Sequence, residues 1–79
     1  MKDTRIDNEQ FRPRTYGLQE LGQLYFPHST PRSASSQLKK WIKHNSALLS
    51  SLYAVGYYRG QKILTPKQVR VIVEYLDPP

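Results

Sequence analysis

Seventy-nine residues suffice for one domain with a small core. The chain has no cysteine, which excludes a disulfide framework and a thiolate zinc site, so packing must supply the stability. No apolar stretch approaches the roughly 20 residues that span a bilayer, and the polar, acidic start differs from a secretory signal. We therefore expect a cytoplasmic protein that has no membrane partner.

The net charge of +6 is unevenly distributed along the chain. All six acidic residues lie near the two ends, and residues 21–73 contain none. The same segment holds both histidines and the basic residues Arg32, Lys39, Lys40, Lys43, Arg59, Lys62, Lys67 and Arg70. A folded core of this composition has a positive potential that attracts polyanions. The alternative is an ordinary soluble surface that happens to be basic.

The first part of the chain predicts a disordered arm, residues 1–11, ahead of a single domain over residues 12–79. Pro13 disfavours a helix where the arm meets the domain. The aromatic residues on either side of it, Phe11 and Tyr16, indicate an extended piece that lies on the core.

Two helices joined by a proline-containing turn are expected over residues 18–45. The first helix covers residues 18–26, and Pro27 ends it. Its apolar face consists of residues three or four positions apart, namely Leu18, Leu21 and Tyr25, with Leu24 at the edge. Gly22 inside this helix costs about 1 kcal/mol relative to alanine. Close approach of a neighbouring helix would compensate for that cost.

The second helix, residues 31–45, has the clearest amphipathic pattern in the chain. Thr30 and Pro31 are residue types that start helices, because the threonine oxygen accepts from a free N–H and proline lacks one. The inner face is expected to hold Ala34, Leu38, Trp41 and Ile42. The outer face is expected to hold Arg32, Ser36, Lys39 and Lys43, with Lys40 beside them.

A third helix begins at a cap formed by Asn45 or Ser46, runs to about Val55 and ends at Gly56. Its inward residues are expected to be Leu48, Leu49, Leu52 and Val55. Residues 57–64 follow with a turn at Arg59 and Gly60, for which a short β-hairpin and a plain loop both fit.

The fourth helix, residues 66–76, begins with Thr65 and Pro66 and has Gln68 in the position of a capping box. One apolar stripe consists of Val69, Ile72, Val73 and Leu76. A second stripe, Val71 and Tyr75, lies nearly opposite. A helix that is apolar on two sides needs two partners, which are either both within this chain or include a second copy of it.

The motifs of the common enzyme classes are missing from the sequence. It contains no glycine-rich phosphate loop, no nucleophile elbow and no helix with paired histidine ligands. His28 and His44 have no cysteine and no nearby acid that could complete a metal site. We expect a protein that is not an enzyme and has no cofactor, no metal and no small-molecule substrate.

A short helix, a turn and a helix with a basic outer face form the layout of a helix-turn-helix, whose second helix lies in the major groove. Near the start of that helix, the residues placed to meet base edges are Arg32, Ser33, Ser35 and Ser36. The flexible ammonium groups of Lys39, Lys40 and Lys43 are suited to phosphates. A hairpin over residues 57–64 would add Arg59 and Lys62 as a wing.

Three features weaken this match. A helix with lysines on its outer face is common in soluble helical proteins of any function. The turn from Pro27 to Thr30 lacks the usual glycine, and Arg32 is the only arginine on the second helix, although bidentate arginine–guanine pairing is the commonest specific contact.

Several short strings together resemble one bacterial family. They are Tyr16-Gly17, Glu20-Leu21, Leu24-Tyr25-Phe26-Pro27, Thr30-Pro31-Arg32-Ser33-Ala34, Leu38, Trp41-Ile42, Gly56-Tyr57, Thr65-Pro66, Gln68-Val69 and Ile72. The chain from about Arg14 onward is similar to domain of unknown function 4248, a family of small proteins common in Bacteroides-type bacteria. Ser35 and Ser36 depart from that family, in which basic residues often follow the alanine. The resemblance implies the fold and a bacterial origin, and it implies no activity.

The sequence thus predicts a mainly α, four-helix, helix-turn-helix-like domain with room for a short β-hairpin. The predicted function is that of a non-catalytic DNA-binding or transcription-associated accessory protein that contacts DNA with the helix 31–45. The alternative is a protein-interaction module or homodimer that uses Val71 and Tyr75 on the helix 66–76. RNA is a third partner to consider, although the aromatic stacking motifs of known RNA-binding modules are missing.

Overall fold

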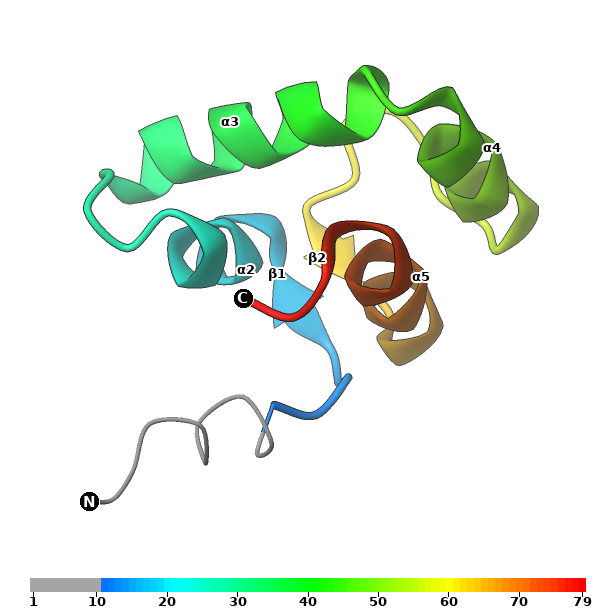
Figure 1. Cartoon of the computed structure of the whole chain (residues 1–79), viewed down its shortest axis with the longest axis horizontal. Helices are drawn as coiled ribbons and strands as arrows, with labels where there is room; N and C mark the ends of the chain where they lie inside the picture. The colour runs from blue at the N-terminus through cyan, green and yellow to red at the C-terminus, as the bar shows by residue number, and fades with distance from the viewer. Residues whose placement is uncertain (1–10) are drawn as a thin grey trace.

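Four helices and one pair of short antiparallel strands make up residues 11–79, the part of the chain described by the computed structural model (Figure 1). In chain order the elements are β1 (Tyr16–Gly17), α2 (Leu18–Tyr25), α3 (Pro31–Lys43), α4 (Ser46–Ala54), β2 (Ile63–Leu64) and α5 (Pro66–Leu76). The predicted mainly α, four-helix class is confirmed. The predicted disordered arm, apart from Phe11, lies outside the described residues.

The two Thr-Pro helix starts form as the sequence predicts. Thr30 Oγ1 accepts the backbone N–H of Ser33 at 3.2 Å, at the start of α3. Thr65 Oγ1 accepts the N–H of Gln68 at 3.2 Å, and Gln68 Oε1 accepts the N–H of Thr65 at 3.0 Å. This second pair is a reciprocal capping box, which satisfies two donors at the start of α5.

Helix α3 is shorter than the predicted range of 31–45, because it ends at Lys43. Asn45 is already the cap of α4, where its Oδ1 accepts the N–H of Leu48 at 3.1 Å. A residue that caps the next helix has extended backbone angles and cannot continue the previous one. Lys43 therefore lies in the last turn of α3, where positive charge is favoured by the helix dipole.

The core is built from one or more residues of every element. Its buried apolar residues are Tyr16, Leu18, Leu21, Ala34, Leu38, Ile42, Leu48, Leu52, Leu64, Val69 and Ile72. The predicted inward residues of the first and third helices are confirmed, with Leu49 and Val55 only partly buried and Leu24 exposed.

Helices α2 and α3 approach each other closely at Gly22. A Cβ added to Gly22 would lie 2.9 Å from the carbonyl carbon and oxygen of Ala34 and 3.0 Å from the Ser35 nitrogen. The predicted compensation for a glycine inside α2 is therefore confirmed. Ser35 is buried at this contact and its hydroxyl donates to the Arg32 carbonyl oxygen at 3.0 Å, so its predicted contact with base edges is wrong.

Trp41 does not lie on the buried face of α3, and that prediction is also wrong. Its side chain is 44% exposed, whereas Ala34, Leu38 and Ile42 are buried against α2 and the rest of the core. The indole packs edge-on against Phe26, with ring centroids 4.5 Å apart, and against Tyr25 at 6.1 Å. The indole therefore covers the end of α2 from the flank of α3.

Strand β2 pairs with β1 rather than with the residues just before it. The register places Tyr16 opposite Leu64 and Gly17 opposite Ile63, and the N–H of Leu18 extends the ladder to the Lys62 carbonyl at 2.7 Å. The expected short antiparallel pair is present, but it does not form a hairpin within residues 57–64. Figure 1 shows the two strands between α2 and α5, so the pair ties the first described strand to the last helix.

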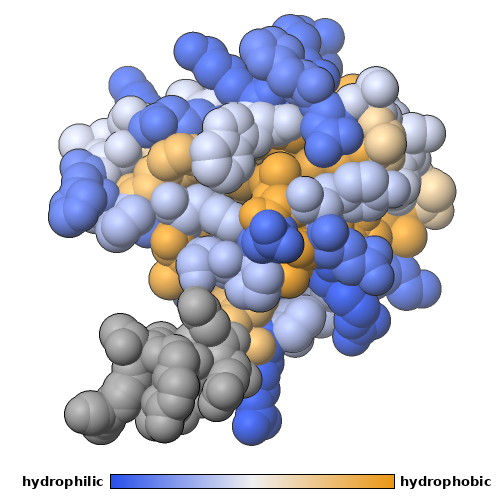
Figure 2. Space-filling view, in the orientation of Figure 1, coloured by the Kyte–Doolittle hydropathy of each residue, from blue (hydrophilic) through white to orange (hydrophobic). Residues whose placement is uncertain are grey.

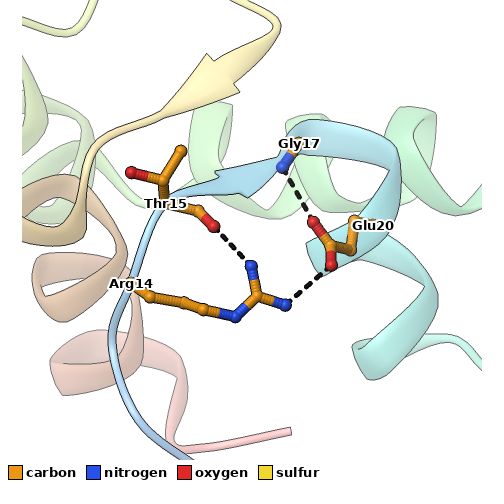
Figure 3. A network of polar contacts seen from close by, with 4 residues as sticks. All are labelled: Arg14, Thr15, Gly17 and Glu20. Atoms are coloured by element: carbon orange, nitrogen blue, oxygen red, sulfur yellow. Dashed lines mark hydrogen bonds and ion pairs between the residues drawn. The ribbon is translucent and has the colours of Figure 1, made fainter.

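The extended piece before β1 is held against the domain by Arg14 (Figure 3). Its guanidinium donates to Glu20 Oε2 at 2.7 Å and lies 3.7 Å from the Tyr16 ring centroid. The Phe11 ring stacks on the Tyr16 ring with a centroid distance of 5.7 Å, so the extended piece lies on the core as the sequence indicates. The hydrogen bond from Arg14, and then that from the Gly17 N–H, holds the pKa of Glu20 below its usual value.

Candidate nucleic-acid interface

The outward side of α3 is polar along its whole length. In Figure 2, hydrophilic side chains gather along the edge of the molecule formed by this helix. The residues that the sequence places there are all exposed, namely Arg32, Ser33, Ser36, Lys39, Lys40 and Lys43. The opposite side is fixed by Leu38 and Ile42 in the core, so this orientation of α3 is set by packing.

The end of α4 brings Tyr57 back against its own helix. Gly56 has a φ of +90°, and its N–H donates to the Tyr53 carbonyl at 3.1 Å while the Tyr57 N–H donates to the Leu52 carbonyl at 3.0 Å. These two bonds define a Schellman motif, in which glycine is preferred at the position of positive φ. The chain turns back so that the Tyr57 ring lies 5.9 Å from the Tyr53 ring.

A buried pair of amides anchors the loop of residues 57–62. Gln61 Nε2 donates to Gln68 Oε1 at 2.7 Å, and Gln68 Nε2 lies 3.3 Å from both Gln61 Oε1 and the Val55 carbonyl oxygen. Gln61 Oε1 also accepts the N–H of Tyr58 at 3.2 Å. Every amide group in this pair therefore has a partner, as buried polar groups require. The loop is held between the end of α4 and the start of α5.

This loop places a third basic side chain next to two lysines of α3. Together with α4 they surround a surface hollow of about 460 Å³, which we call the tyrosine hollow. It is lined by Lys39, Ile42, Lys43, Leu49, Tyr53, Tyr57, Arg59 and Gly60. Burial, and then the neighbouring Tyr53, raises the pKa of Tyr57, so its phenol stays neutral at physiological pH.

A second hollow, of about 440 Å³, lies on the other side of Lys39, and we call it the strand hollow. Its lining combines α2, α3 and the region of β2, and it consists of Gly17, Leu18, Gln19, Ser35, Lys39, Gln61, Lys62 and Ile63. Lys39 lines both hollows. The structure therefore brings Lys39, Lys43, Arg59 and Lys62 to one side of the domain, although the last two are far from α3 in sequence.

The remaining predicted site residues lie elsewhere on α3. Arg32, Ser33, Ser36 and Lys40 are exposed but line neither hollow. Ser33 Oγ lies 3.3 Å from Gln37 Nε2, which also donates to Ser29 Oγ at 2.8 Å, so this end of the helix is tied to the preceding turn.

Tyr53 and Gln61 were not predicted to belong to this surface, and for Tyr57 the sequence left open a place in a hairpin wing or in the core. The Gly56-Tyr57 step was the available signal for the tyrosines, because a Schellman motif returns the residue after glycine to the helix. Nothing local marks Gln61, whose partner Gln68 belongs to the next helix.

No acidic side chain neutralises this basic side within the described part of the chain. Among residues 11–79 the one ion pair joins Arg14 to Glu20, at the entrance to α2. Lys39, Lys43, Arg59 and Lys62 line their hollows without an acidic residue. Their charges therefore add to one positive field.

The family model for a domain of unknown function, DUF4248, matches residues 12–79. The chain belongs to this family. No curated protein and no solved structure matches the chain. The predicted membership in the DUF4248 family is confirmed. The match covers every described residue except Phe11.

In this DUF4248 domain, the second apolar stripe of α5 packs partly within its own chain. Val71 is half-buried against the core. The Tyr75 hydroxyl lies 2.9 Å from Ser51 Oγ on α4, although the side chain is 42% exposed. Two partners for α5 are thus present in one copy of the domain. A partner surface at Val71 and Tyr75 stays a prediction.

Two further observations concern the described residues of the DUF4248 domain as a whole. No cluster of three or more histidine, cysteine, aspartate or glutamate side chains within them could hold a metal ion. None of their helices combines the length and the apolar character that are needed to cross a membrane.

Proposed function

We propose that the domain is a non-catalytic DNA-binding or transcription-associated accessory protein that contacts duplex DNA with the exposed side of α3 in the manner of a helix-turn-helix. The observation that carries this proposal is the convergence of four cations, Lys39 and Lys43 from α3 with Arg59 and Lys62 from the loop of residues 57–62. Acidic residues are absent from the sequence between residues 21 and 73. A surface of this kind suits the phosphates of nucleic acid.

The dimensions of α3 support the same proposal. Thirteen residues give a helix of about 20 Å at roughly 1.5 Å per residue, and its outer side is free along that length in the described chain. In a major groove, Arg32, Ser33 and Ser36 near the start of α3 would approach base edges. Lys39, Lys40 and Lys43, with Arg59 and Lys62, would approach phosphates. Affinity would then depend mainly on charge and only weakly on base sequence.

A salt titration tests the proposal directly. Binding of a mixed-sequence duplex should weaken steeply with salt, with a slope of about −4.5 in log K against log [salt] if each of these five cations neutralises one phosphate. Fluorescence anisotropy of a labelled duplex gives this slope. The absence of binding at low salt would overturn the proposal.

A matched pair of charge reversals locates the binding surface. Lys39→Glu with Lys43→Glu should abolish binding, because both residues lie on the proposed surface. Lys67→Glu with Arg70→Glu makes the same change of charge on the exposed side of α5, and it should weaken binding only modestly. Equal losses in the two double variants would mean that general charge attraction, and not α3, accounts for binding.

A further inference from the structure

The tyrosine hollow has two walls of different chemistry. One wall carries the cations Lys39, Lys43 and Arg59, and no acidic residue lines the hollow. The rest of the lining is mainly aromatic and aliphatic, with Tyr53 and Tyr57 beside Ile42 and Leu49. Duplex binding through α3 uses the first wall, and it leaves the second without a role.

Tyr53 is not needed to close the core. Its side chain is 52% exposed, and its ring is tilted by 46° from that of Tyr57 at a centroid distance of 5.9 Å. Both rings line the hollow, and about half of the Tyr53 side chain is exposed. An exposed aromatic ring beside cations is the arrangement with which proteins bind unpaired bases, because the base stacks on the ring and its phosphate meets the cations.

We propose that the tyrosine hollow binds one unpaired nucleotide of a DNA strand, with the base against Tyr53 and Tyr57 and the phosphate among Lys39, Lys43 and Arg59. This inference rests on the proposed function and names the form of DNA that the surface prefers. The bases of an intact duplex are stacked on one another, so only a gap, an overhang or a loop presents one to the hollow.

The size and the walls of the hollow fit this occupant. Its volume of about 460 Å³ lies within the range of roughly 300–1,000 Å³ typical of sites for small organic ligands. No residue of β1 or β2 lines it, so it offers no strand edge to an extended peptide backbone. An acidic peptide would therefore depend on side chains alone, whereas a nucleotide uses both walls.

The test compares two DNAs of the same sequence, a blunt duplex and a duplex with a gap of three nucleotides. Anisotropy should show that the gapped duplex binds about tenfold more tightly than the blunt duplex. A tenfold change in affinity lies within the range that the stacking of one base on an aromatic side chain provides. Tyr53→Leu should reduce that preference to none while affinity for the blunt duplex stays unchanged, and Tyr53→Phe should retain it.

Tyr58→Leu is the matched control, because Tyr58 is another tyrosine of this region, is 61% exposed and does not line the hollow. This variant should keep the preference for the gapped duplex. Equal affinity of the wild type for both DNAs, or equal loss of preference in Tyr53→Leu and Tyr58→Leu, would overturn the nucleotide site and leave the proposed duplex binding intact. Binding of neither DNA would overturn both. Specific binding of an acidic tyrosine-containing peptide, without a preference for gapped DNA, would assign the hollow to a peptide and overturn the inference.

Discussion

Gly22 of α2 and Ala34 of α3 lie so close together that a single methyl group on Gly22 would overlap the Ala34 backbone. The added Cβ would be 2.9 Å from the Ala34 carbonyl carbon and oxygen. Because these are backbone atoms, no side-chain rotation can relieve the overlap. The spacing of α2 and α3, and with it the orientation of the outer side of α3, depends on this glycine.

We expect Gly22→Ala to destabilise the domain, although the same change in a free helix gains about 1 kcal/mol. Overpacking typically costs about 1–3 kcal/mol, and the upper part of this range applies because the backbone of α3 has to move. After the gain of about 1 kcal/mol in helix propensity, the free energy of unfolding should fall by about 1–2 kcal/mol. Urea denaturation measures this loss. Gln19→Ala, at an exposed position of the same helix, should change stability by less than about 0.5 kcal/mol. Equal stability of the wild type and Gly22→Ala would contradict the close approach.

Trp41→Ala should lower the free energy of unfolding by about half of what truncation of a fully buried tryptophan costs, or about 1.5–2.5 kcal/mol. The indole is 44% exposed and packs mainly on Phe26 and Tyr25. Leu38→Ala, at a fully buried position of the same helix, should cost about 2–5 kcal/mol. Denaturation of the two variants under the same conditions gives the comparison. A larger loss for Trp41 than for Leu38 would contradict the flank position of the indole.

The amide pair of Gln61 and Gln68 should behave as one unit. Each single change to alanine removes the bonds between the two amides, together with the bonds from the lost side chain to the backbone, which costs about 1–3 kcal/mol. The double variant should be more stable than the sum of the single losses predicts, with a coupling energy of about 1 kcal/mol or more. A double-mutant cycle from urea denaturation measures this energy. Additive losses would show that the two amides act independently.

The stability of the domain should fall in alkaline solution through Tyr25. Burial, and then the charge of Asp77, raises the pKa of Tyr25 to about 12, and its hydroxyl donates to the Asp77 carbonyl oxygen at 2.6 Å. In the unfolded chain the pKa is about 10. The contribution is thus complete below pH 10 and is lost as the pH rises from about 10 to about 12.

The difference in stability between the wild type and Tyr25→Phe should therefore be smaller at a pH of about 11 than at a pH of about 9. Thermal melts followed by circular dichroism measure it at the two values. Tyr58→Phe serves as the control, since this exposed hydroxyl has no hydrogen bond to another described residue. A difference that does not change with pH would show that Tyr25 ionises as easily in the folded state as in the unfolded state.

Helix starts were predictable because their signals are local. Thr30 and Thr65 each bond a backbone N–H three residues ahead, so the sequence alone places the first turns of α3 and α5 correctly. The cost of Gly22 also pointed to a close neighbour, although not to its identity. Trp41 was misplaced because an amphipathic pattern gives a sector of the helix and says nothing about how much room lies beneath it.

The partner of β2 and the composition of the hollows could not be predicted from local patterns. Two residues make too short a strand to show alternation, and Leu64 pairs with Tyr16 from the other end of the domain. Arg59 lines the same hollow as Lys43 only because Gly56 reverses the chain after α4 and Gln68 anchors the loop. These are tertiary contacts, and each depends on elements that are distant in the sequence.

The pairing of β1 with β2 also sets an order of assembly while the chain is being synthesised. Helices α2 and α3 are consecutive, so they can pack as soon as Lys43 has left the ribosome. Strand β1 has no partner until Leu64 emerges. The loop of residues 57–62 has no anchor until Gln68 follows. A nascent chain thus displays the lysines of α3 well before Arg59 and Lys62 are fixed beside them, and the full basic side forms only after Gln68 has emerged.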